Sequence, residues 1–224
     1  MKKLKINFYT SEQPIQDVTT KFGGQPNWYT KPEWPLSRSL NKPMSFICQI
    51  KIDKSIFPES QAEMAYIFMT DDEEYVDGTW EAEGGENAII LQPGNTTVPI
   101  TKLITGPTLT KYVQVEGQQE LQPQEIELRV TLNEDNDPSF ISEDDDITNE
   151  EIDEYHDKTE GNKIGGSPAF IQGDEFPDES DNWLLLLQLD SCDDNYSLNF
   201  GDAGVSYSFI NKEGTKAKFI WQCG

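Results

Sequence analysis

Residues 21–26, Lys-Phe-Gly-Gly-Gln-Pro, recur as residues 163–168, Lys-Ile-Gly-Gly-Ser-Pro. The offset between the two segments is 163 − 21 = 142 residues. A Gly-Gly step before proline is a strong turn signal, because glycine reaches positive φ and proline fixes φ at about −65°. The recurrence predicts that the chain builds the same type of turn twice.

Three more matches follow in the same order. Residues 33–35 correspond to 175–177, residues 46–50 to 185–189, and residues 66–68 to 207–209, with Gln49 matching Gln188 at an offset of 188 − 49 = 139. This period is much longer than that of solenoid repeats. The apolar runs around the two glutamines are typical of central strands, and the Tyr-x-Phe segments suit half-buried strands beside them.

We therefore expect a mainly β (α+β) fold with few short helices. It would be a single domain, residues 1–224, built from two tandem-duplicated β units packed with pseudo-twofold symmetry. The first unit covers about residues 21–132, an acidic connection about 134–160, and the second unit about 163–223. Segments 88–91, 111–115, 126–132 and 218–221 predict further strands.

The repeated segments resemble the YwqG-like family of bacterial proteins. The matching pieces are the turn at 23–26, Trp34-Pro35, the strand at 45–52, and the blocks 165–168, 183–189, 201–209 and 221–223. The resemblance covers about residues 21–70 and 163–223, with Phe200 where the family commonly has tryptophan. It implies a mostly β, duplicated, single-domain fold and no established activity. Relatives lie beside secreted-toxin systems, so an immunity role is one expectation.

The net charge of the chain favours some classes of binding partner over others. The chain has 41 acidic and 17 basic residues, a net charge of −24. This excess argues against nucleic acid and anionic membranes, which bind Lys and Arg, and favours a cationic protein. Residues 134–160 hold 13 acidic residues and one basic residue, so half of the net charge lies there (1 − 13 = −12).

The acidic connection is the first candidate site. Thr148 and Glu151 have the spacing of a capping box, which predicts a helix from there to about Lys158, after a mobile loop at 134–147. A solvated linker is the alternative interpretation. A calcium loop from Asp135 to Asp146 is weaker, because Phe140 stands where such a loop needs glycine. The predicted partner-binding residues are Glu143, Asp144, Asp145, Asp146, Glu150, Glu151, Asp153 and Glu154.

Three other residues are cleft candidates. Gln49 and Gln188 are amides inside apolar strands, so each is either a buried cross-link to backbone or part of a cleft shared by the two units. Asp202 lies between glycines, where it either caps a turn or acts as a general base. His156 is the single histidine and the three cysteines lack metal-ligand spacing, so we assign no catalytic residue, metal or cofactor.

These observations favour a non-enzymatic protein-binding protein, of the type of an immunity inhibitor that holds a cationic toxin domain. The alternatives are a carboxylate-based enzyme, a small-ligand binder that uses the cleft between the repeats, or an accessory protein. No signal peptide is evident, and no segment approaches the ~20 apolar residues of a membrane span, so we expect a cytoplasmic location.

Overall fold

The computed structural model describes residues 1–72, 74–142, 147–179 and 181–224. Within them the chain is mainly β, as predicted, with one helix, α1 (Asn149–Thr159), which is neither long nor apolar enough to cross a membrane. The strands are β1 (Lys2–Thr10), β2 (Lys21–Gly23), β3 (Trp34–Pro35), β4 (Ser45–Lys51), β5 (Met64–Met69), β6 (Asn87–Gln92), β7 (Ile100–Thr101), β8 (Thr110–Val113), β9 (Gln122–Glu125), β10 (Glu127–Asn136), β11 (Lys163–Gly165), β12 (Trp183–Asp190), β13 (Val205–Asn211) and β14 (Ala217–Gln222).

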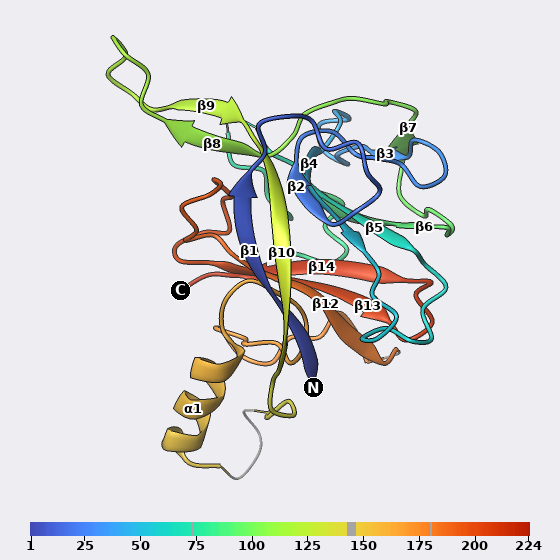
Figure 1. Cartoon of the computed structure of the whole chain (residues 1–224), viewed down its shortest axis with the longest axis vertical. Helices are drawn as coiled ribbons and strands as arrows, with labels where there is room; N and C mark the ends of the chain where they lie inside the picture. Colours follow the sequence, from blue (N-terminus) through green and yellow to red (C-terminus); the bar gives the residue numbers. More distant parts are fainter. Residues whose placement is uncertain (73, 143–146, 180) are drawn as a thin grey trace.

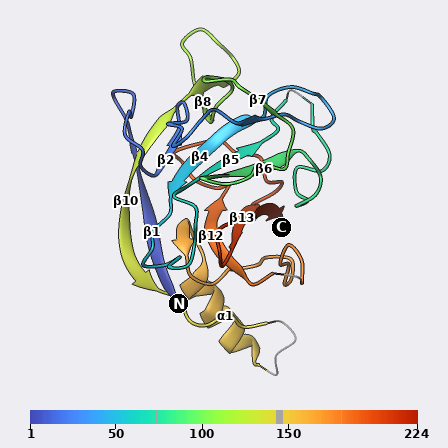
Figure 2. The same cartoon turned by 90° about the vertical axis from the view of Figure 1, so that its right-hand side faces the viewer.

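Ten strands form one antiparallel sheet in the order β14-β13-β12-β11-β1-β10-β2-β4-β5-β6. β1 and β10 pair along their whole length at its centre, from Lys2 opposite Asn136 to Thr10 opposite Leu128. The sheet curls until its two edge strands, β6 and β14, lie near each other (Figures 1 and 2). β8 and β9 form a separate hairpin that projects from the body, and α1 lies at the opposite end (Figure 1). Whether this arrangement comes from two duplicated units stays a prediction.

The hydrophobic core has three parts. The largest cluster joins the two halves of the curled sheet: Phe22 and Ile67 from one half pack in it with Leu186 and Phe219 from the other. A second cluster packs on the other face of β4, β5 and β6 around Trp34, and a third packs on β12, β13 and β14. The three clusters together cover both faces of the curled sheet with apolar side chains. Burying one such side chain stabilises the fold by about 1.5–3 kcal/mol.

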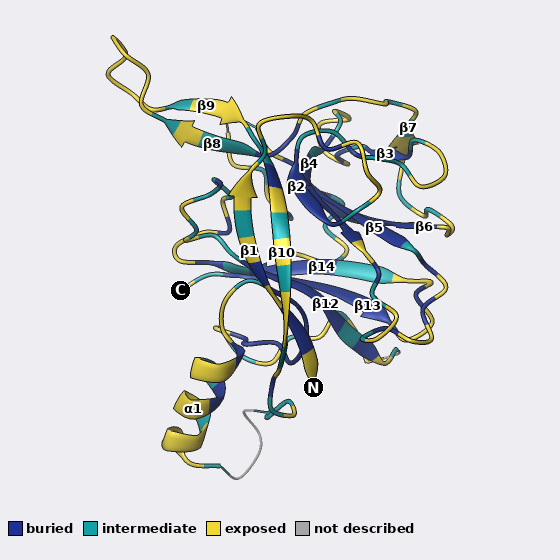
Figure 3. Cartoon of the chain, viewed as in Figure 1, coloured by how far each residue is buried: buried dark blue, intermediate teal, exposed yellow. Residues whose placement is uncertain are grey.

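The strand β5 corrects one expectation. The Tyr-x-Phe pattern predicts a half-buried strand, but all six residues of β5 are buried (Figure 3). Ala65 and Ile67 enter the central cluster, whereas Tyr66 and Phe68 enter the second cluster. The strand is buried on both faces because the loop that carries Trp34 packs over its outer face.

Only one of the two central strands was predicted: the expected strand at 126–132 overlaps β10, whereas β1 was not expected. β1 begins with Lys2, Lys3 and Lys5, which resemble a basic terminus rather than a strand. β10 continues to Asn136, so the expected loop at 134–147 is wrong for its first three residues. Both differences have one cause: β1 and β10 pair with each other over a long sequence separation, which no local pattern encodes.

Candidate functional site

The acidic connection divides into parts with different roles. Asp137 is fully buried and bonded to the ammonium groups of Lys3 and Lys163. Asp135 pairs on the surface with Lys5, at 2.9 Å between Oδ2 and Nζ. The calcium interpretation is therefore wrong for these two carboxylates, and the described residues contain no group of three or more side chains placed to hold a metal. Glu143, Asp144, Asp145 and Asp146 lie outside the described residues.

The helix α1 starts where the capping box predicts. The Thr148 Oγ1 atom accepts from the Glu151 backbone N–H at 3.3 Å, and the Glu151 carboxylate accepts from the Thr148 N–H at 2.9 Å. These bonds from Thr148 lower the pKa of Glu151. Glu151 thus caps the helix, a structural role that differs from the partner contact predicted for it. The Tyr155 hydroxyl anchors the helix by donating to the Pro168 carbonyl at 2.7 Å.

The two sides of α1 differ in chemistry. Tyr155 and Thr159 face the body and are buried. The outer face carries exposed carboxylates at the i, i+3, i+4 and i+7 positions of a helix. They are Glu150, Asp153, Glu154 and Asp157. Of the described residues, Lys158 is the one ion-pair partner of this face, and it pairs with Glu154 at 2.5 Å. The sequence argument missed Asp157, although its position three residues after Glu154 could have identified it.

The Gly-Gly turns rest on buried lysines. Lys163 Nζ lies 2.7 Å from Asp137 Oδ2 and donates to the carbonyls of Ser167, at 2.6 Å, and Thr159. Burial lowers the pKa of Lys163 to about 8, against the opposing effect of Asp137. Two cations, Lys3 and Lys163, therefore share one buried carboxylate.

Lys21 occupies the matching position beneath the first turn. Its Nζ lies 2.5 Å from Glu127 Oε1 and donates to the carbonyls of Gln25 and Ile15, at 2.6 and 3.4 Å. Glu127 is 15% exposed and also accepts from the Ile15 N–H. Each lysine thus ties the loop around its turn to the sheet, but Lys21 has its carboxylate to itself.

The two predicted cleft amides bind backbone. Gln49 accepts from the Asn27 N–H at 2.8 Å and donates to the Thr19 carbonyl at 2.7 Å. Gln188 accepts from the Ala169 N–H at 2.9 Å and donates to the Thr159 and Gly161 carbonyls. Four strands of the sheet separate β4 from β12, and each amide holds the loop that covers its own strand. The cavity described below is not lined by either of them.

Further polar groups hold the same loops and were missed. The Tyr66 hydroxyl donates to the Asn27 carbonyl at 2.9 Å, and the Tyr207 hydroxyl donates to the Ala169 carbonyl at 2.5 Å. Burial raises the pKa of Tyr66 to about 12 and raises that of Tyr207 as well. Gln92 and Gln222 also bond to these loops, Gln92 through the Thr30 N–H and Gln222 through the Ile171 N–H. Both tyrosines belong to the matched segments 66–68 and 207–209, from which the sequence predicted strands but not these hydrogen bonds.

Asp202 lies on an exposed turn. Gly201 and Ala203 on either side of it have φ values of 79° and 47°. Its main-chain carbonyl accepts from the Gly224 N–H at 2.8 Å. The turn is tight because Gly204 approaches the Phe200 carbonyl so closely that a Cβ there would lie 1.8 Å from the oxygen.

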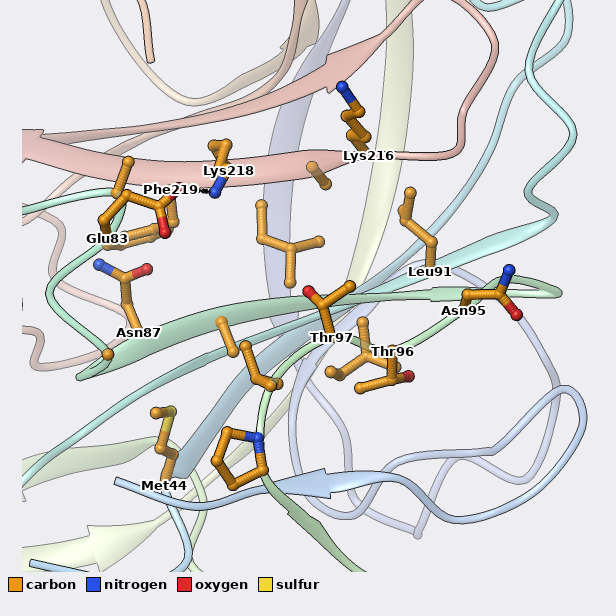
Figure 4. A pocket seen from close by; sticks show the side chains of 18 of the residues that line it. Met44, Glu83, Asn87, Leu91, Asn95, Thr96, Thr97, Lys216, Lys218 and Phe219 are labelled. Atoms are coloured by element: carbon orange, nitrogen blue, oxygen red, sulfur yellow. Dashed lines mark hydrogen bonds and ion pairs between the residues drawn. The ribbon is translucent and has the colours of Figure 1, made fainter. Parts of the chain in front are cut away.

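A large cavity lies between the two edge strands of the sheet. It has a volume of about 560 Å³ and is bordered by β6 and by β14 with the turn before it. Figure 4 shows Lys216 and Lys218 on the β14 side and Asn87, Leu91 and Asn95 on the β6 side. We call it the seam cavity. Its residues come from segments more than a hundred positions apart, so no local pattern predicts it.

The family described as "Domain of unknown function (DUF1963)" matches residues 20–223. The matched region contains both Gly-Gly turns, α1 and the two edges of the seam cavity, whereas β1 lies ahead of it. A comparison with the curated proteins gave no match.

Proposed function

Because the chain belongs to the DUF1963 family, a family of unknown function, we propose its function from the surface it presents: a non-enzymatic binding protein that holds a cationic protein domain against α1. We place it within the YwqG-like type, in a bacterial cytoplasm, as an immunity-type inhibitor of a cationic toxin domain. The segments that carry that resemblance fall inside residues 20–223.

The acidic outer face of α1 carries the proposal. Like charges three and four residues apart destabilise a helix by about 0.2–0.5 kcal/mol per pair. Asp157 also lies in the last turn, where the helix dipole disfavours a carboxylate. Helix stability accounts for Glu150, which lies in the first turn, and for Glu154, which pairs with Lys158, but it gives no reason for Asp153 and Asp157 on the same face. A cationic partner would remove the repulsion, and the net charge of −24 would speed the encounter.

The capping and ion-pair contacts single out two residues for the test. Glu151 caps the helix and Glu154 pairs with Lys158, so changing either also disturbs α1. Glu150 and Asp153 are exposed and make no side-chain hydrogen bond or ion pair within the described part of the chain. The double variant Glu150→Gln/Asp153→Asn therefore removes two charges from the face while leaving the cap intact.

The experiment is affinity capture from native lysate by three baits: the unchanged protein, Glu150→Gln/Asp153→Asn, and a matched control. The control, Glu116→Gln/Glu120→Gln, removes two exposed charges beside the β8–β9 hairpin instead. We expect the unchanged protein and the control to retain the same basic protein at low salt, and the α1 variant to lose it. Elution at about 0.5 M salt is expected, because salt screens exposed charges. Equal capture by all three baits, or no basic protein at all, would refute the proposal.

A further inference from the structure

The sheet stops just short of closing between β6 and β14. β5 bonds to β6 through Glu86 and every second residue after it, so Ile89 and Leu91 direct their backbone groups away from β5. By the same alternation Ala217 and Phe219 direct theirs away from β13. Within the described residues no hydrogen bond joins the two strands, so these backbone groups border the seam cavity (Figure 4).

The charge of this cavity is opposite to that of the protein. Its charged lining consists of Arg38, Lys216 and Lys218 against Glu83 and Asp178. Over the whole chain acidic residues outnumber basic ones by 41 to 17, and only two residues are arginine. A basic excess in a cavity of so acidic a chain indicates a site for negative charge.

Lys218 is the best placed of these cations. Its side chain is 25% exposed and pairs with Glu83, whose carboxylate is 78% exposed. Arg38 lies beside them, donating from Nη1 to the Glu83 main-chain carbonyl at 2.9 Å. Lys216 is held at the rim by Asp181, at 2.7 Å, and this hydrogen bond raises its pKa. The Glu83 carboxylate thus sits on Lys218 from the solvent side, where another anion can replace it.

The rest of the lining suits a molecule with an apolar body. Leu36 and Ile89, which are half-buried, contribute apolar surface to the cavity, and the half-buried Ala217 does so from the opposite side. Thr96 also lines it, and its buried Oγ1 has no hydrogen-bond partner among the described residues. Such an atom costs about 1–3 kcal/mol when left unsatisfied, so it points to a group that is bound there.

We propose that the seam cavity binds an organic anion. Its carboxylate or phosphate head replaces the Glu83 carboxylate at Lys218, and its apolar body lies against Leu36, Ile89 and Ala217. A volume of about 560 Å³ falls within the range of small-molecule sites. This site is separate from the acidic face of α1, so anion binding in the seam cavity does not depend on whether α1 binds a cationic partner.

The test titrates the whole protein with octanoate, octyl phosphate and, as the neutral control, octanol. Calorimetry gives the affinities, and the backbone amide NMR shifts of Ile89, Leu91 and Phe219 report the place of binding. Lys218→Met removes the cation but keeps its aliphatic chain. Glu83→Gln removes the competing carboxylate. Lys212→Met is the matched control, because Lys212 is an exposed lysine with an ion pair to Glu59 and does not line the cavity.

We expect octanoate or octyl phosphate to bind with shifts at these amides, and their relative affinity identifies the preferred head group. Lys218→Met weakens binding about tenfold, as the loss of a charge-assisted hydrogen bond predicts. Glu83→Gln strengthens it several-fold, an effect that a merely structural Glu83 would not produce. Lys212→Met leaves it unchanged. The proposal is overturned if neither anion binds, if octanol binds equally well, or if Lys212→Met weakens binding as much as Lys218→Met.

Discussion

The two lysines beneath the Gly-Gly turns differ in how their charge is balanced. Lys21 pairs with Glu127, which reaches the surface, whereas Lys163 shares the buried Asp137 with Lys3. Desolvation of an ion costs several kcal/mol, and attraction to a partner offsets it only when the geometry is good. The same motif can therefore be balanced locally at one turn and depend at the other on a third residue from the central strand β1.

The largest expected effect is at Asp137. The variant Asp137→Asn leaves two buried ammonium groups without a counter-charge, so we expect a loss of about 4 kcal/mol or more in the free energy of unfolding. Glu127→Gln leaves one buried lysine, Lys21, without its counter-charge but beside a side chain that water can reach, so it should cost less, about 2 kcal/mol. Urea unfolding at pH 7 measures both. Equal losses would show that the two carboxylates contribute equally to the free energy of unfolding, against this prediction.

The buried amides give the next effect. Gln188→Met leaves one N–H and two carbonyls without their partner, and Gln49→Met leaves one of each. We expect losses of about 3 and 2 kcal/mol, since each unsatisfied buried group costs about 1–3 kcal/mol and water satisfies part of them. Urea unfolding again provides the measurement. A larger loss for Gln49→Met would contradict the prediction that the loop held by Gln188 contributes more to the free energy of unfolding.

Stability should also rise with pH because of Lys163. Its pKa is about 8 in the folded protein and 10.5 in an ordinary lysine, so between these values the unfolded chain binds more protons. The contribution of Lys163 to the free energy of unfolding then increases by about 2 kcal/mol from pH 7.5 to 9.5, and the buried Cys48 thiol, whose pKa burial raises, opposes part of this increase. Above pH 10 the buried tyrosines act in the opposite direction, because their folded pKa values are raised.

Two variants test the origin of that slope in unfolding experiments at pH 7.5, 8.5 and 9.5. Lys163→Met should abolish the rise, since Asp137 then keeps Lys3 as its single partner. Lys21→Met should retain the rise while lowering stability at every pH. A slope that survives in Lys163→Met would assign it to another group.

The smallest effect concerns α1, which adjoins only the Lys163 site. Thr159, at the end of the helix, accepts from both Lys163 and Gln188. Thr148→Ala removes the N-cap and should lower the local stability of α1 by about 1 kcal/mol. Hydrogen exchange of the α1 amides measures this, and Thr148→Ser, which keeps the hydroxyl oxygen, should exchange as the unchanged protein does. Equal exchange in Thr148→Ala would mean that packing of Tyr155 alone holds the helix.

Local patterns predicted those elements whose cause is local. The strands around Gln49 and Gln188 follow from apolar runs, and α1 follows from Thr148 and Glu151. Asp137 could not be distinguished in the same way, because in sequence it is one of 13 acidic residues in its segment. Only its position between Lys3 and Lys163 separates it from the solvated carboxylates.

The seam cavity was beyond prediction for a related reason. Its existence depends on how far the sheet curls, and that is set by twist accumulated over ten strands rather than by any one segment. Lys218 belongs to the predicted final strand at 218–221, whereas Arg38, Thr96 and Lys216 lie outside every predicted strand. These residues form one site because β6 and β14 approach each other without pairing.

The place of β1 in the sheet has a consequence for synthesis on the ribosome. β1 is made before every other strand, yet Leu4 pairs with Glu134 on one side and with Ile164 on the other. β2, β4, β5 and β6 can pair among themselves as they emerge, whereas β1 must wait for both of its neighbours. Contacts over such sequence separations form slowly, and an unpaired strand is exposed to aggregation in the meantime. The centre of the finished sheet thus stays incomplete until β11 has been made, although its first strand is the first one synthesised.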